Sequence, residues 1–239
     1  MVKGGWELLT KILAKPFRAR TDKRSLSEGE QVMKINHVIR TLVMSDLFIN
    51  AGFSVFGPVF AIFVTKQITG GSLEVLGFAA AIFQIFKSGL QIPIARYLDK
   101  NHGEYDDFYS MILGTALVVL VPFAYIFAST ANHIYIIQAI YGIGAAFTIP
   151  PWYAIFSRHL DKMQENVEWS MDSIAIGIGA AASAAIGGIL AQKFGFQVVF
   201  IAGGILAVFG GIQQLRIFGD LRGKVPRGVV KPQPDGLTR

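Results

Sequence analysis

Lys87 stands near the middle of an apolar stretch that is about long enough to cross a lipid bilayer. A charged side chain at the bilayer centre costs at least about 2.5–3.5 kcal/mol, so such residues almost always face the interior of a helix bundle, a partner or water. Two interpretations of Lys87 stay open. It lines a polar cavity that holds a solute, together with Asp46 of the preceding apolar stretch, or it forms a buried ion pair with Asp46 that only fixes the register of two helices.

Lys87 belongs to a wider set of polar side chains that recur every three or four residues within apolar stretches and therefore share helix faces. The candidate solute-binding residues of this set are Asp46, Asn50, Gln84, Lys87, Gln91, Gln138 and Tyr141. They fall on three separate stretches, and this spread favours a polar cavity over a single structural ion pair. Asp172 lies near one end of another stretch, where helix capping explains a carboxylate as well as a place in the cavity does.

The composition is typical of a membrane protein. Apolar residues make up 52% of the chain and charged residues 16%, against about 25% charged residues in a soluble domain. The mean hydropathy is +0.48. Cysteine is absent, which excludes a disulfide framework, a thiolate metal site and a cysteine nucleophile. The sequence contains no HExxH or GxSG motif, so we expect neither enzymatic activity nor a cofactor or metal.

The elements that would position the polar residues are six apolar stretches of about membrane-spanning length. They cover residues 38–64, 76–97, 109–129, 133–156, 170–192 and 197–218. We therefore expect an all-α membrane protein with six transmembrane helices over residues 38–218. A basic cytoplasmic segment, 1–37, precedes them, either as an amphipathic helix on the membrane surface or as a loosely ordered arm. A disordered cytoplasmic tail, 219–239, follows.

Lysine and arginine are distributed unevenly about the six stretches. With an even number of spans both termini lie on one side, which carries the basic N-terminal segment, the basic tail and the basic residues of two connecting loops. The opposite side has only Lys66 and Lys193. By the positive-inside rule, both termini are cytoplasmic in a multi-pass protein of the cell (inner) membrane. The net charge of +6 is thereby explained by the membrane surface, and no nucleic-acid partner is expected.

Small residues recur every four positions in the fifth stretch, "GIGAAASAAIGG". Gly179, Ser183 and Gly187 form a face of the small-xxx-small type, which lets two helices approach closely. We expect these three residues to pack a neighbouring helix.

Two segments resemble the major facilitator superfamily of secondary transporters. "GLQIPIARYLDKNHGEYDD" is similar to that family's cytoplasmic loop signature, G-x-L-x-D-R-x-G-R-R, with Asp99 and Lys100 at the acidic and basic positions and Gly103 one place late. The fifth stretch is similar to the family's antiporter motif, although Ser183 replaces a glycine there. Gln138 stands near the position where many members carry an arginine.

The resemblance implies that the six helices form a 3+3 inverted repeat, which is one half of the usual twelve-span fold. It also implies that the loop at Asp99 and Lys100 gates the cytoplasmic side. A single six-helix bundle would expose its polar stripes to lipid, so we expect two copies to pair as a homodimer with two-fold symmetry around a shared cavity.

The implied function is secondary transport of a small polar solute by alternating access. Lys87, doubled by symmetry, favours a sugar, a sugar phosphate or an organic acid. Asp46 is a candidate proton carrier, but a neighbouring Lys87 would keep it ionised, so facilitated and proton-coupled transport stay open. Two alternatives remain for the whole chain: half of a heteromeric or longer transporter, and a six-helix membrane scaffold or sensor that transports nothing.

Overall fold

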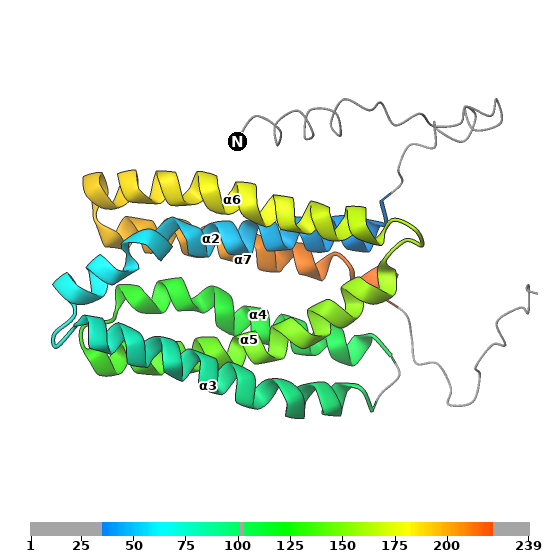
Figure 1. Ribbon diagram of the computed structural model, residues 1–239, viewed down its shortest axis with the longest axis horizontal. Helices are drawn as coiled ribbons and strands as arrows, with labels where there is room; N and C mark the ends of the chain where they lie inside the picture. Colours follow the sequence, from blue (N-terminus) through cyan, green and yellow to red (C-terminus); the bar gives the residue numbers. More distant parts are fainter. Residues whose placement is uncertain (1–34, 101–102, 222–239) are drawn as a thin grey trace, which may run out of the picture. The chain divides into compact units, whose positions relative to one another are not determined.

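The computed structural model describes residues 35–100 and 103–221, and over these residues it is all-helical (Figure 1). Its elements are α2 (His37–Gln67), α3 (Leu73–Leu98), α4 (Tyr105–Ile126), α5 (Ala131–His159), α6 (Glu165–Phe194), α7 (Phe196–Leu215) and a short 3-10 turn, η1 (Phe218–Asp220). The six α-helices are each long and apolar enough to span a membrane. The predicted all-α fold with six transmembrane helices is therefore confirmed.

Two parts of the predicted domain organisation lie mostly outside the described residues. These are the basic N-terminal segment, of which 1–34 are not described, and the tail, of which 222–239 are not described. Where the structure does describe the tail, it differs from the prediction. Residues Phe218–Asp220 form a turn and Leu221 is buried, so the helical part of the chain extends past the predicted boundary at 218.

Local signals set several helix ends. The Asn36 side chain caps α2 by accepting a hydrogen bond from the backbone N–H of Val38 (2.9 Å). Ser72 caps α3 in the same way, by accepting from the backbone N–H of Val75 (3.2 Å). Only Gly195 separates α6 from α7, and its φ of +83° is one that glycine adopts without the steric cost of a side chain.

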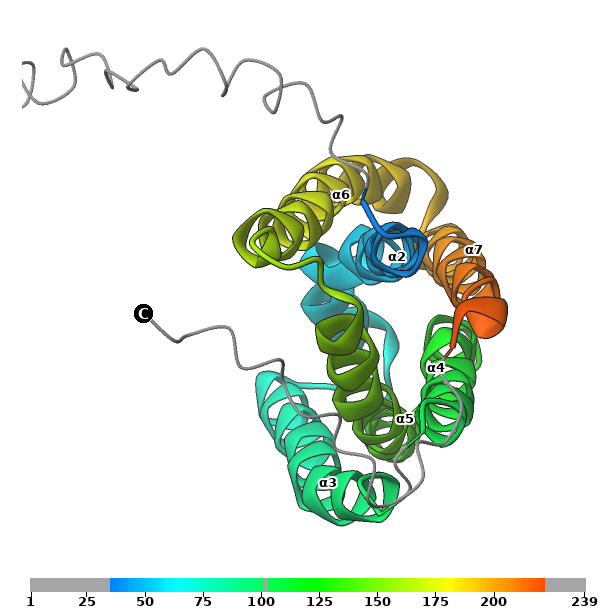
Figure 2. The same cartoon turned by 90° about the vertical axis from the view of Figure 1, so that its right-hand side faces the viewer.

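The helices pack in two groups of three (Figure 2). Helix α2 packs against α6 and α7, while α5 packs against α3 and α4, and α4 meets α7 between the groups. Exchanging α2 with α5, α3 with α6 and α4 with α7 maps these contacts onto one another. An inverted 3+3 repeat requires this relation, although the repeat itself stays a prediction.

Helix α6 crosses α2 at a very short distance through the predicted small-residue face. A Cβ atom on Gly187 would collide with the backbone of Val55, lying 3.0 Å from its Cα and closer still to its carbonyl group. A Cβ on Gly179 would lie 3.2 Å from the Leu47 side chain, and Ser183 is buried between these two glycines. Only residues without a large side chain allow this approach.

Apolar cores hold the bundle at both ends. One contains Phe56, Phe63, Tyr125 and Phe200 near the end where α2 gives way to α3, and the other contains Leu42, Met111, Trp152 and Phe156 at the opposite end. In contrast, α3 and α6 bury only 11% of their most apolar windows, against 33–44% for the other four spans. These two helices therefore present large apolar faces to lipid or to a further helix bundle.

Candidate functional site

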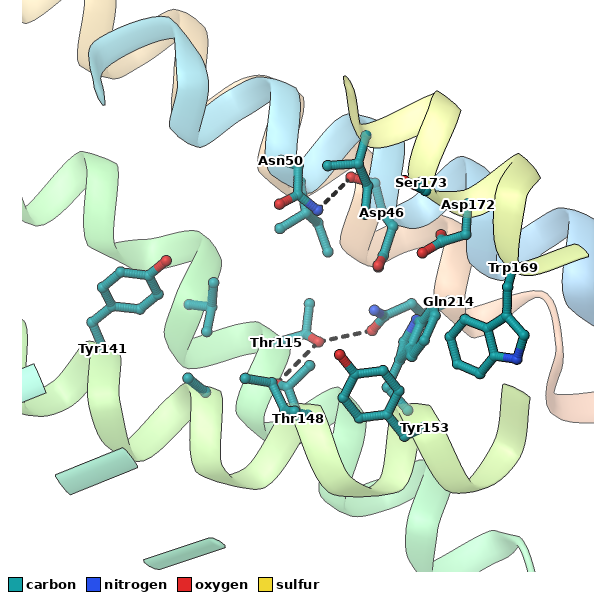
Figure 3. Close-up of a pocket in the computed structure, with 16 residues that line it drawn as sticks. Asp46, Asn50, Thr115, Tyr141, Thr148, Tyr153, Trp169, Asp172, Ser173 and Gln214 are labelled. Atoms are coloured by element: carbon teal, nitrogen blue, oxygen red, sulfur yellow. Dashed lines mark hydrogen bonds between the residues drawn. The ribbon is translucent and has the colours of Figure 1, made fainter. Parts of the chain in front are cut away.

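A polar cavity of about 490 Å³ lies between the two helix groups, with walls from α2, α4, α5, α6 and α7 (Figure 3). Its polar and aromatic lining residues are Asp46, Asn50, Thr115, Tyr141, Thr148, Trp152, Tyr153, Trp169, Asp172, Ser173 and Gln214. Most of these residues lie in the part of their helix nearer the predicted cytoplasmic end, whereas Tyr141 lies nearer the opposite end of α5. The two apolar cores lie on either side of this level of the bundle.

Two carboxylates face this cavity from neighbouring helices. Asp46 projects from α2 and Asp172 from α6, and Figure 3 shows both pointing into the cavity. They are close enough to interact electrostatically. Asp172 is 7% exposed, and its Oδ1 has no hydrogen-bond partner among the described residues. Among the described residues, the lining contains no lysine, arginine or histidine, so the formal charge of this part of the cavity wall is negative when both carboxylates are ionised.

Hydroxyl and amide groups form the opposite wall. The Thr115 hydroxyl donates a hydrogen bond to Oε1 of Gln214 (2.8 Å), and the Thr148 hydroxyl donates to the backbone carbonyl of Gly144 (3.0 Å). Gln214 is completely buried, yet its Nε2 has no partner in the described part of the chain, and neither has Nε1 of Trp152. An unsatisfied buried donor or acceptor costs about 1–3 kcal/mol. The cavity is therefore built to hold water or a polar solute.

Aromatic rings close the cavity on two sides. Trp152 and Trp169 lie with ring centroids 6.3 Å apart, and Tyr153 contacts both of them. At the other side, Tyr141 stacks on Phe53 with a centroid distance of 4.9 Å. The side chains that could contact a solute thus combine two acidic groups, several neutral donors and acceptors, and aromatic faces.

Three of the predicted binding residues line this cavity: Asp46, Asn50 and Tyr141. The Asn50 amide donates to the backbone carbonyl of Asp46 (2.9 Å), one turn earlier on α2. Gln138 lies outside the cavity, and its amide donates to the buried Tyr125 hydroxyl (3.1 Å). In the single chain, Gln138 therefore stabilises the contact between α4 and α5.

The predicted α3 stripe also lies outside this cavity. Gln84 is exposed, whereas Lys87 and Gln91 are partly buried, and α3 packs mainly on α5. The Lys87 ammonium lies 5.6 Å from the centre of the Phe83 ring, within range of a cation–π interaction. The alternative of an ion pair with Asp46 has no counterpart among the salt bridges of the described residues. In the single chain, α3 packs mainly on α5 and little on α2, which carries Asp46.

Sequence reasoning undervalued or missed several lining residues. Asp172 was explained equally well as a cap, but the cap of α6 is Gln164 and Asp172 lies two turns further along. Thr115 and Gln214 sit on stretches that carry no polar stripe, so only the packing of α4 against α7 reveals them. The signal available for Gln214 was its place at the end of an otherwise apolar segment.

The predicted gating loop lies at one end of the bundle, beside an ion-paired cluster. Asp99 is the C-cap of α3, and both Asp99 and Lys100 are exposed. Asp107, at the start of α4, is buried and forms a salt bridge with Arg158 of α5. Asp99 is near enough to Asp107 to interact with it electrostatically. A gating role for this loop stays a prediction.

The sequence profile of the Major Facilitator Superfamily matches residues 42–236, which is most of the chain. The chain belongs to the major facilitator superfamily. As a member of this family of transporters, the chain is a multi-pass membrane protein, and each of its six α-helices is long and apolar enough to cross a bilayer.

A solved structure shows the same fold. The chain is similar to a crystal structure of the POT family transporter PepTSo, with a TM-score of 0.60 and 13% sequence identity over 79% of this chain. The match covers 38% of that transporter, so this chain spans well under half of its length. At this identity the likeness shows the major facilitator fold and nothing finer.

Proposed function

We propose that the protein is a secondary transporter that works as a homodimer, by alternating access, on a small polar solute. The observation that carries the proposal is the cavity between the two helix groups, because it gathers two carboxylates with amide and indole groups that have no partner among the described residues, inside an apolar bundle. Such groups are costly in a membrane and are typical of a solute pathway. We place both termini in the cytoplasm and the protein in the inner membrane, as the positive-inside rule indicates.

The exposed faces of α3 and α6 support pairing of two copies. In a dimer with its axis along the membrane normal, α3 of one protomer would pack against α6 of the other. Pairing would cover the two least buried helices. It would also turn Gln84, Lys87 and Gln91 towards a shared space, which explains polar side chains on a helix that otherwise faces lipid.

The class of solute, and the coupling of its transport to protons, depend on which side chains face the cavity of each protomer and the space shared by the two protomers. A sugar fits the hydroxyl, amide and aromatic lining of the cavity, whereas a sugar phosphate or an organic acid would depend on Lys87 from both protomers. Transport is either facilitated or coupled to protons, for which Asp46 and Asp172 are the candidate carriers.

A stabilisation screen followed by uptake tests the transport function. The purified chain is heated with each member of a panel of sugars, amines and organic acids, and every compound that raises the melting temperature is then offered to proteoliposomes. We expect at least one compound that both stabilises the chain and accumulates in the vesicles. A panel without a stabilising or transported compound would contradict transport and favour a scaffold or sensor.

Cysteine cross-linking tests the homodimer. The chain has no cysteine of its own, so cysteines at Gln84 of α3 and Ile178 of α6, both exposed, are the only reactive thiols. We expect a bismaleimide to give a covalent dimer in membranes where this chain is expressed alone.

The matched control places the two cysteines at Leu120 of α4 and Ile205 of α7, which are exposed on helices outside the proposed interface. This pair should stay monomeric. Equal cross-linking of both pairs, or a monomer in both, would contradict the homodimer, and the second result would favour half of a heteromeric transporter.

A further inference from the structure

We infer that the cavity takes a small organic cation, a solute that carries a protonated amine and a separate hydrogen-bond acceptor. The inference rests on the proposed transport function, and it replaces the sugar, sugar phosphate or organic acid named above by a cationic solute. It is carried by the juxtaposition of two carboxylates, aromatic side chains on two sides and two buried donors that have no partner in the described part of the chain (Figure 3).

The charged side chains that line the cavity favour a cationic solute. Asp46 and Asp172 face the cavity from two helices, and within residues 35–100 and 103–221 none of the lining residues is basic. Lys87, which we predicted to bind the solute, lies outside the lining, and its ammonium group lies over the Phe83 ring. Two neighbouring carboxylates repel each other when both are ionised, and a positive charge between them removes this repulsion. A protonated amine supplies that charge and donates the hydrogen bond that Oδ1 of Asp172 lacks.

The aromatic side chains that line the cavity favour a cation as well. Trp152, Tyr153 and Trp169 lie together beside the end of the cavity that holds Asp172, and Tyr141 lies towards Asn50. Cations are attracted to the faces of such rings within about 6 Å of the centroid. A cavity that was built for a phosphate or a carboxylate would place basic groups where these rings and carboxylates lie.

Two buried hydrogen-bond donors of the lining indicate a second polar group on the solute. Nε2 of Gln214 and Nε1 of Trp152 are buried without a partner among the described residues. An ammonium group cannot satisfy them, because it has no acceptor. A hydroxyl, ether or carbonyl oxygen in the same molecule can do so. The solute is therefore expected to be bifunctional, with an amine towards Asp46 and Asp172 and an oxygen towards Gln214.

Tryptophan fluorescence reports on the cavity itself. Trp152 and Trp169 line it, and the third tryptophan of the chain, Trp6, lies outside the described residues and is removed by Trp6→Phe. The full chain in detergent is titrated with three compounds of matched shape that share an ether oxygen as the acceptor: 2-phenoxyethylamine, 2-phenoxyethanol and phenoxyacetate. We expect the amine to bind at least about tenfold more tightly than the neutral alcohol and the anion.

Substitution of the two cavity carboxylates tests whether they cause the preference for the amine. Asp46→Asn and Asp172→Asn are each expected to weaken amine binding about tenfold while leaving binding of the alcohol unchanged, which shows that the cavity is intact. Glu74→Gln, which removes an exposed carboxylate in the first turn of α3, should change neither.

Equal affinity for the three compounds, or no binding of any of them to the unsubstituted protein, would overturn the cation assignment. A transported sugar or acid together with no amine preference would overturn it and leave the transport function standing. An amine preference in a chain that transports no member of the panel would support the cation site and remove the transport function.

Discussion

Asp172→Asn is expected to lower solute uptake into proteoliposomes by about tenfold to a hundredfold, with little change in melting temperature. The physical reason is that hydrogen bonds to charged groups are worth about 1.5–3 kcal/mol, and the Asp172 carboxylate lines the cavity with one oxygen that has no partner among the described residues. Asparagine keeps the size of the side chain but removes its charge. The measurement is the initial rate of uptake of the compound that the stabilisation screen identifies.

Glu74→Gln is the matched control for this loss, because it makes the same carboxylate-to-amide change at an exposed position away from the cavity. It should transport at the rate of the unsubstituted chain. If Asp172→Asn also keeps that rate, the carboxylate does not act in transport, and the cavity is then only a hydrated gap between helices.

Gly187→Ala is expected to destabilise the bundle by about 1–3 kcal/mol or more, which is the cost of inserting a methyl group where no space exists. Here the obstruction is backbone, since a Cβ on Gly187 meets the carbonyl group and Cα of Val55. Side-chain rotation cannot relieve it, so α6 must move away from α2. The effect is measured as a fall in the melting temperature of the purified chain in detergent, which size-exclusion chromatography after heating detects.

The neighbouring glycine provides the control. A Cβ on Gly188 meets nothing within 4 Å, so Gly188→Ala should melt at the temperature of the unsubstituted chain or above it, because alanine favours helix over glycine. Equal melting temperatures for the two alanine variants would show that α6 does not cross α2 at Gly187.

The helices could be predicted because bilayer thickness demands long apolar segments, and their ends could not. The third apolar stretch was predicted to begin at residue 109. In the structure, α4 begins at Tyr105 and includes Asp106 and Asp107. These carboxylates extend the helix beyond its apolar part, and Asp107 is satisfied by Arg158 from another helix. Hydropathy reports where a helix crosses lipid and carries no information on how far it continues.

The cavity was predictable only where a polar residue lies deep within one stretch. Asp46 and Asn50 share a face of α2 and could be found by their spacing, and both line the cavity. Lys87 has the same kind of signal but lies on α3, which packs on α5 through the close approach of Gly142 to the backbone at Phe83. Which helix lies beside which, and which face each turns inward, depends on contacts between distant segments. Asp172 lines the cavity because of such contacts, so its own stretch of sequence could not identify it as a site residue.

The most direct test of alternating access needs no knowledge of the solute. A single cysteine at Ser173, which lines the cavity, is exposed to a membrane-impermeant maleimide in right-side-out and in inside-out vesicles. A cysteine at Met163, which is 93% exposed in the loop between α5 and α6, reports the orientation of the vesicles. We expect labelling of position 173 from both sides of the membrane and of position 163 from the cytoplasmic side only. Labelling of position 173 from one side alone, with and without the compounds of the panel, would contradict alternating access.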